Sequence, residues 1–297
     1  MRALSLHPDV VVVTSSVWRT SATLVRGPGE QPESVLVDSP VLPVELDALR
    51  GLAEQGGFAV AGLLATHADW DHLLGRLAFP DAPLGVDERS AARLTARIGE
   101  PQRRLREFDR EWYVERPSPL ALGELQPLPV PGRLELGDQT VDVHDGAGHT
   151  GDGLLLWLDW ARVLIVGDYL SPAELPSWDA TGSRAAYRAT LDRIAGLVSD
   201  GVRWVVAGHG GPIGRDEALL LLDEDRDYLD GGAVPARGGR AASAKQHAAN
   251  LATWDRPADP LPPLDQLPLP GPPDAAGAAG AAGPPGAVGD NLPRPER

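Results

Sequence analysis

The chain has 297 residues, and 42% of them are hydrophobic, which is enough for a sizeable core in one large domain or two small ones. It contains no cysteine, so disulfides, thiolate metal ligands and thiol nucleophiles are excluded. The net charge of −15 lies in residues 1–230, and because a phosphate backbone is bound by clustered Lys and Arg, we expect no nucleic-acid partner.

The first half of the chain alternates apolar runs with segments of helical composition. Its first residues lack the cationic stretch and apolar core of a secretory signal, and no apolar run of about 18 residues could span a membrane. We therefore expect a cytoplasmic protein without a membrane partner. The predicted elements are strands at Val10–Thr14, Trp18–Val25, Val35–Asp38 and Ala59–Ala65, a helix from about Val44 preceded by Pro43, and a helix over Glu88–Ile98.

Arginine is concentrated between Arg93 and Arg110, the one stretch where basic residues gather. Glu100, Glu107 and Asp109 are interspersed with them. Mixed charges of this kind are typical of a solvent-exposed helix face, so we predict a solvated helix and not a nucleic-acid-binding patch.

The second half carries further strands and two helices. One helix covers Arg184–Val198 and opens after Ser183, a good N-cap residue, and an acidic helix covers Glu217–Leu229. Strands are predicted near Leu134–Leu136, Thr140–His144, Leu154–Leu158, Val163–Val166 and Val202–Ala207. Elements grouped in this way suit two sheets flanked by helices, in the α+β class.

Past Asp230 the composition changes. Residues 231–297 contain 13 of the 29 prolines and ten of the glycines. We therefore expect one domain over residues 1–230, a linker over 231–260 with a short docking helix at Ala241–Trp254, and a disordered tail over 261–297.

The segment from Thr66 to His72 reads Thr-His-Ala-Asp-Trp-Asp-His and directly follows the predicted buried strand Ala59–Ala65. In a loop after a strand, His67 and Asp69 point the same way, whereas Asp71 and His72 diverge. One loop could therefore serve two neighbouring metal ions. Imidazole and carboxylate ligands suit zinc, iron or manganese. The alternative is a polar loop with two incidental histidines.

Other ligand-type residues also follow strands and lie near glycine, which weakens that alternative. Glycine permits tight turns and a close approach of the backbone to a site. The residues are Asp38 after Ser34–Val37, His149 in the glycine-rich loop Gly146–Gly153, Asp168 after Arg162–Val166, and His209 after Trp204–Ala207.

Taken in order, these motifs resemble the five motifs of the metallo-β-lactamase fold superfamily of metallohydrolases, over roughly residues 9–229. The resemblance implies an αββα sandwich. It also implies that His67, Asp69 and His149 hold a first metal, that Asp71, His72 and His209 hold a second, and that Asp168 bridges the two. Asp38 would orient a ligand and its loop.

The sequence departs from the usual superfamily signature, H-x-H-x-D-H, at Asp69. The metallo-β-lactamase domains of competence-type DNA-uptake proteins resemble H-x-D-x-D-H, and flavodiiron proteins carry Glu there. Asp69 could ligate the first metal or only accept a hydrogen bond. As a ligand, together with Asp71 and Asp168, it would make the site more oxygen-rich and cancel more of the metal charge. We then expect a preference for manganese or iron over zinc beyond that of the usual superfamily site.

Asp71 and Tyr169 are the candidate catalytic residues. Tyr169 follows Asp168, and its phenol could donate a hydrogen bond to a developing oxyanion, as tyrosines do in several superfamily members. His144, at the end of a predicted strand, is expected at the rim or in the core. The segment Pro172–Ser183, with Trp178, is the expected specificity loop.

The resemblance implies a dinuclear hydrolase in which metal-bound hydroxide attacks a small-molecule substrate. The body is similar in length to the glyoxalase II and lactonase branch, which favours a small ester, thioester or lactone. One alternative is a metal-dependent nuclease or phosphodiesterase, supported by H-x-D-x-D-H and opposed by the acidic charge. A second is a non-haem iron oxidoreductase, although no flavodoxin-like domain follows. The weakest is a non-enzymatic metal-binding sensor.

Overall fold

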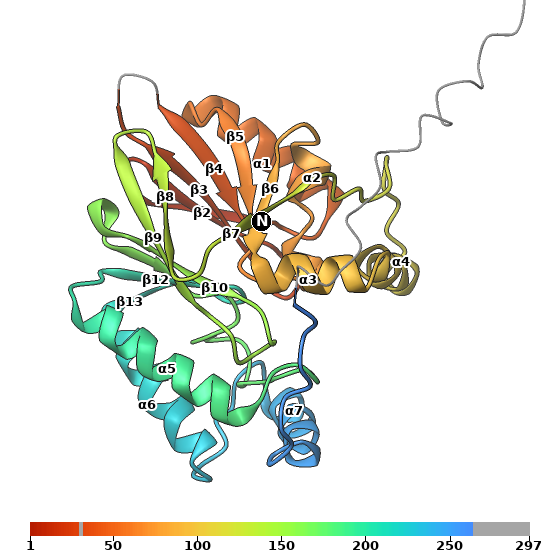
Figure 1. The fold of residues 1–297 in the computed structure, drawn as a ribbon, viewed down its shortest axis with the longest axis vertical. Coiled ribbons are helices and arrows are strands. Elements are labelled where there is room, and N and C mark those ends of the chain that lie inside the picture. Colours follow the sequence, from red (N-terminus) through yellow and green to blue (C-terminus); the bar gives the residue numbers. More distant parts are fainter. Residues whose placement is uncertain (30–31, 264–297) are drawn as a thin grey trace, which may run out of the picture. The chain divides into compact units, whose positions relative to one another are not determined.

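The structure is a computed structural model that describes residues 1–29 and 32–263 (Figure 1). All the described residues belong to one compact unit. This unit contains two β-sheets packed face to face, with helices on their outer sides. Among the described residues, no helix is long and apolar enough to cross a membrane.

The first sheet comes from the N-terminal half of the chain. Its strands follow chain order: β1 (Arg2–His7), β2 (Val10–Thr14), β3 (Ser21–Gly27), β4 (Glu33–Val37), β5 (Val60–Leu64), β6 (Leu84–Asp87) and β7 (Leu125–Leu128). Strands β1 to β4 pair antiparallel, and β4 to β7 pair parallel. Parallel neighbours need crossover connections. These contain α1 (Pro43–Gly56), the turn η1 (Trp70–His72), α2 (Gly75–Ala78), α3 (Glu88–Ala96) and α4 (Glu100–Trp112).

The second sheet comes from the C-terminal half. Its strands lie in the order β13 (Gly211–Gly214), β12 (Trp204–Ala207), β11 (Val163–Ile165), β10 (Leu154–Leu158), β9 (Gln139–Asp145) and β8 (Gly132–Leu136). Only β11 and β12 pair parallel within this sheet. The other elements here are η2 (Asp159–Ala161), α5 (Arg184–Ser199) and α6 (Arg215–Leu229), and in Figure 1 both helices run along the outer side of the sheet.

Strand β10 shows how the alternating sides of a strand build the layers. Leu154 and Leu156 pack between the two sheets, together with Val12 of β2. Leu155 packs on the other side, in the core that includes Leu191 of α5. A third core joins the outer side of the first sheet to α1 and α3. The predicted α+β class and αββα sandwich are therefore confirmed.

The loops that follow β4, β5, β11 and β12 meet where the two sheets are joined. The N–H of Ser21 donates a hydrogen bond of 2.7 Å to the carbonyl oxygen of Gly208. Thr20 and His209 form an isolated β-bridge beside it. The ends of strands from both sheets are thus held together at one place.

Some predicted boundaries were wrong for local reasons. The strand expected from Trp18 begins at Ser21, because Trp18 and Arg19 have positive φ angles of 53° and 54°. The arginine-rich segment is two helices, since Gly99 is left-handed with φ 80° and separates α3 from α4.

Residues 231–260, expected as a linker with a docking helix, fall within the compact unit Met1–Leu267. The predicted docking helix is α7 (Arg240–Ala252). The amide of the buried Asn250 donates to the carbonyl oxygen of Pro176 at 2.7 Å and to the hydroxyl of Tyr228 at 2.8 Å. Of the expected disordered tail, residues 264–297 lie outside the described residues.

Candidate metal centre

Loops from both sheets bring all seven predicted ligand residues together. The loop after β5 provides four of them, and the other three come from the loops that follow β9, β11 and β12. Their donor atoms form three overlapping groups, within each of which they lie within 4.8 Å of one another: His67, Asp69 and His149; Asp71, His72 and His209; His67, His72 and Asp168.

In the first group, one oxygen of Asp69 faces two imidazoles. Its Oδ2 lies 3.6 Å from Nε2 of His67 and 3.7 Å from Nε2 of His149. Oδ2 of Asp168 lies 3.7 and 3.4 Å from the same two nitrogens. Ligand atoms held ~2.0–2.2 Å from a tetrahedral ion are about 3.3–3.6 Å apart. These four atoms therefore have nearly the spacing of a ligand set.

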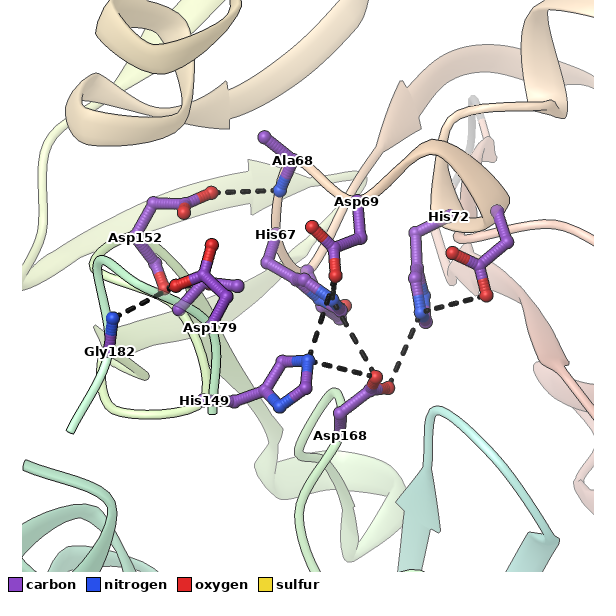
Figure 2. A network of polar contacts seen from close by, with 12 residues as sticks. His67, Ala68, Asp69, His72, His149, Asp152, Asp168, Asp179 and Gly182 are labelled. Atoms are coloured by element: carbon purple, nitrogen blue, oxygen red, sulfur yellow. Dashed lines mark hydrogen bonds and ion pairs between the residues drawn. The ribbon is translucent and has the colours of Figure 1, made fainter. Parts of the chain in front are cut away.

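The second group is arranged in the same way. Oδ2 of Asp71 lies 3.5 Å from Nε2 of His209 and 3.9 Å from Nε2 of His72. Oδ1 of Asp168 lies 3.3 Å from Nε2 of His72, and Oδ2 lies 3.5 Å from Nε2 of His209. Figure 2 shows the Asp168 carboxylate between the imidazoles of His149 and His72. Asp168 is thus shared by both groups.

The polar atoms at the middle of this cluster lack other partners. Nε2 of His67, Nε2 of His72 and Oδ1 of Asp168 are buried and have no hydrogen-bond partner in the described part of the chain. A buried polar atom without a partner is costly. Divalent metal ions would satisfy these atoms, so the residues present suit the ligand set that the sequence predicts.

The outer ring nitrogens of three ligand histidines face oxygen atoms, and those of His149 and His209 have hydrogen-bonding geometry. Nδ1 of His149 lies 2.7 Å from the carbonyl oxygen of Ser177, and Nδ1 of His209 lies 3.1 Å from that of Trp18. Nδ1 of His72 lies 3.2 Å from Oδ2 of Asp38. A proton on Nδ1 leaves Nε2 free as a ligand atom and fixes the orientation of the ring.

Asp38 links the ligand loop to this arrangement. Its carboxylate accepts hydrogen bonds from the backbone N–H of Thr66 at 2.8 Å and from the Thr66 hydroxyl at 2.9 Å, in addition to facing His72. Asp38 itself has a positive φ of 56° at the end of β4. It lies behind a ligand, where a residue that orients that ligand and its loop would lie.

Comparison with known proteins now identifies the family. The family model described as the metallo-beta-lactamase superfamily matches residues 16–209, more than half of the chain. The chain belongs to the metallo-beta-lactamase superfamily. No curated protein matches its sequence.

Solved structures of the superfamily share the fold at low sequence identity. A metallo-beta-lactamase family protein from Thermus thermophilus is 22% identical, covers 76% of this chain and 81% of its own, and has a TM-score of 0.59. A beta-lactamase domain protein from Burkholderia ambifaria is 19% identical, covers 77% of this chain and 76% of its own, and has a TM-score of 0.57. A protein solved in a di-iron-bound form is 23% identical, covers 70% of this chain and 96% of its own, and has a TM-score of 0.52.

Asp69, the residue that departs from the usual superfamily motif, has an ion-pair partner that the sequence did not reveal. Arg93 of α3, which is only 9% exposed, places Nη2 2.6 Å from Oδ1 of Asp69. The prediction of a solvated helix was therefore wrong at Arg93. The charge balance drawn from the sequence also omitted this cation, which offsets the negative charge of Asp69 on the side away from the histidines.

Arg93 is held in turn by two more carboxylates. Its Nη1 donates to Oδ1 of the fully buried Asp152 at 3.0 Å, and its Nη2 lies 3.7 Å from Oδ2 of Asp179. Although burial works against the charged form, Asp69, Asp152 and Asp179 raise the pKa of Arg93 further above its ordinary value, so it stays a cation. Asp152 also accepts from the backbone N–H of Ala68 at 2.8 Å (Figure 2), which ties the ligand loop to α3.

Two residues weighed from the sequence lie apart from the ligand atoms. The Tyr169 hydroxyl accepts from the backbone N–H of His149 at 2.9 Å and donates to the carbonyl oxygen of Gly146 at 3.0 Å. Both bonds are to the backbone of the glycine-rich loop, so the phenol stabilises that loop. This geometry argues against the predicted oxyanion role. His144 is half-buried in β9 and belongs to none of the ligand groups.

The carboxylates at the centre favour protonated histidines when no metal is bound. Burial lowers the pKa of His149, but Asp69 and Asp168 outweigh it and raise the value to about 9. Burial likewise opposes the charged form of His209, yet Asp168, Glu174 and Asp71 raise its pKa to about 10. Metal binding would therefore displace protons from these imidazoles.

Proposed function

We propose that the chain is a dinuclear metal-dependent hydrolase that cleaves a small ester, thioester or lactone. The observation that carries the proposal is the position of Asp168, whose two carboxylate oxygens face histidines of both ligand groups. A shared carboxylate suits a pair of ions ~3.5–4 Å apart, the separation of two-metal hydrolytic sites.

The chain's own residues arrange the reactants and move the proton. Bound divalent ions would lower the pKa of a water to about 7 and polarise the bond to be cleaved. In ester hydrolysis a bond forms from the water oxygen to the acyl carbon, the bond to the alcohol oxygen breaks, and a proton passes from the water to the leaving group. Asp71 suits this transfer, because its carboxylate belongs to the second ligand group and also lines the adjoining cavity.

The size and charge of the site favour a small substrate. The cavity beside Asp69 and Asp71 has a volume of about 180 Å³. Pockets for drug-sized ligands are roughly 300–1,000 Å³. Together with the net charge of −15, this argues against a nucleic-acid substrate, the alternative raised by the H-x-D-x-D-H motif.

A substrate panel tests the proposal. Protein reconstituted separately with zinc, manganese and iron is offered phenyl acetate, a thioester, a lactone and bis(4-nitrophenyl) phosphate. We expect turnover of at least one of the three carboxylic substrates, and a loss of about a hundredfold or more in kcat for Asp71→Asn. Asp47→Asn, on an exposed residue of α1, is the matched control. Turnover of the phosphodiester alone, or of none of the four, would refute the proposal.

A second candidate, a non-haem iron oxidoreductase, is favoured by the additional carboxylate of Asp69 in the first ligand group. One protein of similar fold was solved in a di-iron-bound form, which is a property of that protein. Carboxylate and imidazole ligands together suit iron. Oxygen consumption by the iron-loaded protein in the presence of a chemical reductant, without hydrolysis of the panel, would favour this candidate.

A further inference from the structure

The cavity beside the metal centre has two arginines that the metal site does not use. It opens next to Asp69 and Asp71, and its wall continues from the end of α3 onto the start of α4. Arg97 and Arg104 line this part of the wall. Neither residue is within any of the ligand groups.

The charges on the cavity wall separate into two regions. Near the metal centre, Asp69 and Asp71 belong to the ligand groups, and Arg93 is engaged by buried or half-buried carboxylates. Farther out, Arg97 faces Glu100 at 3.6 Å, and Arg104 has no ion-pair partner among residues 1–29 and 32–263. The outer region therefore has two guanidinium groups against one carboxylate.

This outer region is locally cationic on a strongly acidic protein. Charges farther than a Debye length of ~8 Å are largely screened at physiological ionic strength. The field inside the cavity is therefore set mainly by the residues that line it. Guanidinium groups bind carboxylate and similar anions through paired N–H donors. The outer region thus has the chemistry to hold an anionic group.

One aromatic side chain, Trp70, also lines this cavity. It packs against Trp18 and Phe108, with ring centroids 5.7 and 5.3 Å away. Phe108 comes from α4, the helix that also carries Arg104. A ligand in this cavity would therefore meet the ring of Trp70, cationic side chains and the Asp69 and Asp71 carboxylates of the metal centre within one small space.

We propose that the substrate is a small anionic ester, thioester or lactone whose carboxylate binds Arg97 and Arg104 while its scissile bond lies at the metal centre. The proposal rests on the hydrolase function proposed above and names its substrate class. It assigns α4 a role in specificity, in addition to the loop over Pro172–Ser183 that the sequence suggested.

Matched esters that differ only in charge test this proposal. The anionic ester is 3-acetoxybenzoate, and its neutral counterpart is 3-acetoxybenzamide. A third ester, 3-acetoxybenzenesulfonate, shows whether the site distinguishes a planar carboxylate from a tetrahedral sulfonate. Arg104→Gln is compared with Arg103→Gln, the neighbouring residue of α4, which is 57% exposed and does not line the cavity. Arg97→Gln provides a second test variant outside α4.

We expect the wild-type protein to prefer an anionic ester over the amide in kcat/KM. Arg104→Gln should reduce that preference by about tenfold, the usual effect of losing a hydrogen bond to a charged group. Arg103→Gln should retain it. The proposal would be overturned if Arg104→Gln and Arg103→Gln showed the same preference for the anionic ester, or if the wild-type protein preferred the amide.

A binding measurement keeps this test separate from the hydrolase proposal. If no ester, thioester or lactone is hydrolysed, the hydrolase proposal fails, and calorimetric titration of metal-loaded protein then compares isophthalate with 3-carbamoylbenzoate. Tighter binding of isophthalate that is lost in Arg104→Gln and kept in Arg103→Gln would support an anion site. Equal binding of the two compounds to the wild-type protein would overturn it.

Discussion

Asp69 and Arg93 act as a pair at the scale of single residues. Asp69 presents Oδ2 to two histidines and Oδ1 to the Arg93 guanidinium. Arg93 therefore offsets part of the negative charge that Asp69 brings in place of the neutral histidine of the usual superfamily motif, although it also faces Asp152 and Asp179. The motif could be predicted from residues 67–72, whereas the pairing depends on how α3 packs and could not be predicted from the sequence.

The first prediction concerns this pair. Asp69→His restores the usual motif, yet it removes the carboxylate that separates the Arg93 cation from the first metal, while Asp152 and Asp179 still face Arg93 on its other side. We expect Asp69→His alone to bind metal more weakly than the double variant D69H/R93M, by roughly tenfold or more, because of the unbalanced charge. Metal titration with a competing chelator measures the difference. The control is D69H/R103M, and equal affinity of D69H/R103M and D69H/R93M would contradict the pairing.

Gly208 is the second residue whose identity the site requires. A Cβ atom at this position would lie 2.1 Å from Oδ1 of Asp168 and 3.0 Å from Cε1 of His72. The glycine therefore permits the backbone after β12 to approach the shared carboxylate. The sequence pointed to this role, because glycine precedes His209 directly.

We accordingly predict that Gly208→Ala displaces Asp168 and lowers the metal content of the purified protein below that of the wild type. Gly196→Ala in α5 is the matched control, since a Cβ there meets nothing within 4 Å. That change should raise helix stability by about 0.5–1 kcal/mol. Elemental analysis of both variants checks the prediction, and an unchanged metal content in Gly208→Ala would refute it.

At the scale of elements, the segments with strong local signals were predictable. Ser183 caps α5 as expected, accepting from the backbone N–H of Ala186 at 3.2 Å. The strands β1, β6, β7 and β13 were not predicted, because they lack the continuous apolar run that identified β11 and β12, and pairing with neighbours defines them. Proline and glycine content alone made residues 231–260 resemble a linker, although contacts distant in sequence hold them in place.

Helix α7 supports the loop that positions His149. Asn250 donates to the carbonyl of Pro176, next to Ser177, whose carbonyl faces Nδ1 of His149. We predict that Asn250→Ala lowers the free energy of unfolding by about 1–3 kcal/mol, the cost of unpaired buried polar groups. Leu251→Ala, at a residue that is 56% exposed, should change it by less than about 0.5 kcal/mol. Urea unfolding of both variants measures this, and similar values would refute the docking role.

At the scale of the whole molecule, the metal-free protein has carboxylates close to imidazoles at the metal centre, and these carboxylates favour the protonated histidines. The folded-state pKa values of His149 and His209, about 9 and about 10, lie above the ordinary value of about 6.5. Their stabilising contribution is fully present below the ordinary value and is lost as the pH rises through the folded-state values.

We therefore predict that the metal-free protein becomes less stable between pH 6.5 and 10, while its affinity for metal increases over the same interval. Thermal unfolding in the presence of a chelator, at half-unit steps of pH, measures the first effect. The His209→Gln variant should show a weaker pH dependence. A metal-free stability that rises with pH across this interval would contradict the assignment of the carboxylate-surrounded histidines.

The central claim is a centre that holds two divalent ions, and metal stoichiometry tests it most directly. Protein freed of metal is dialysed to equilibrium against zinc, manganese or iron, and the metal per chain is measured for wild type and Asp168→Ala. We expect two ions per chain in the wild type with at least one of these metals, and fewer than two in Asp168→Ala, because Asp168 faces both ligand groups. One ion or none in the wild type, with all three metals, would contradict the account.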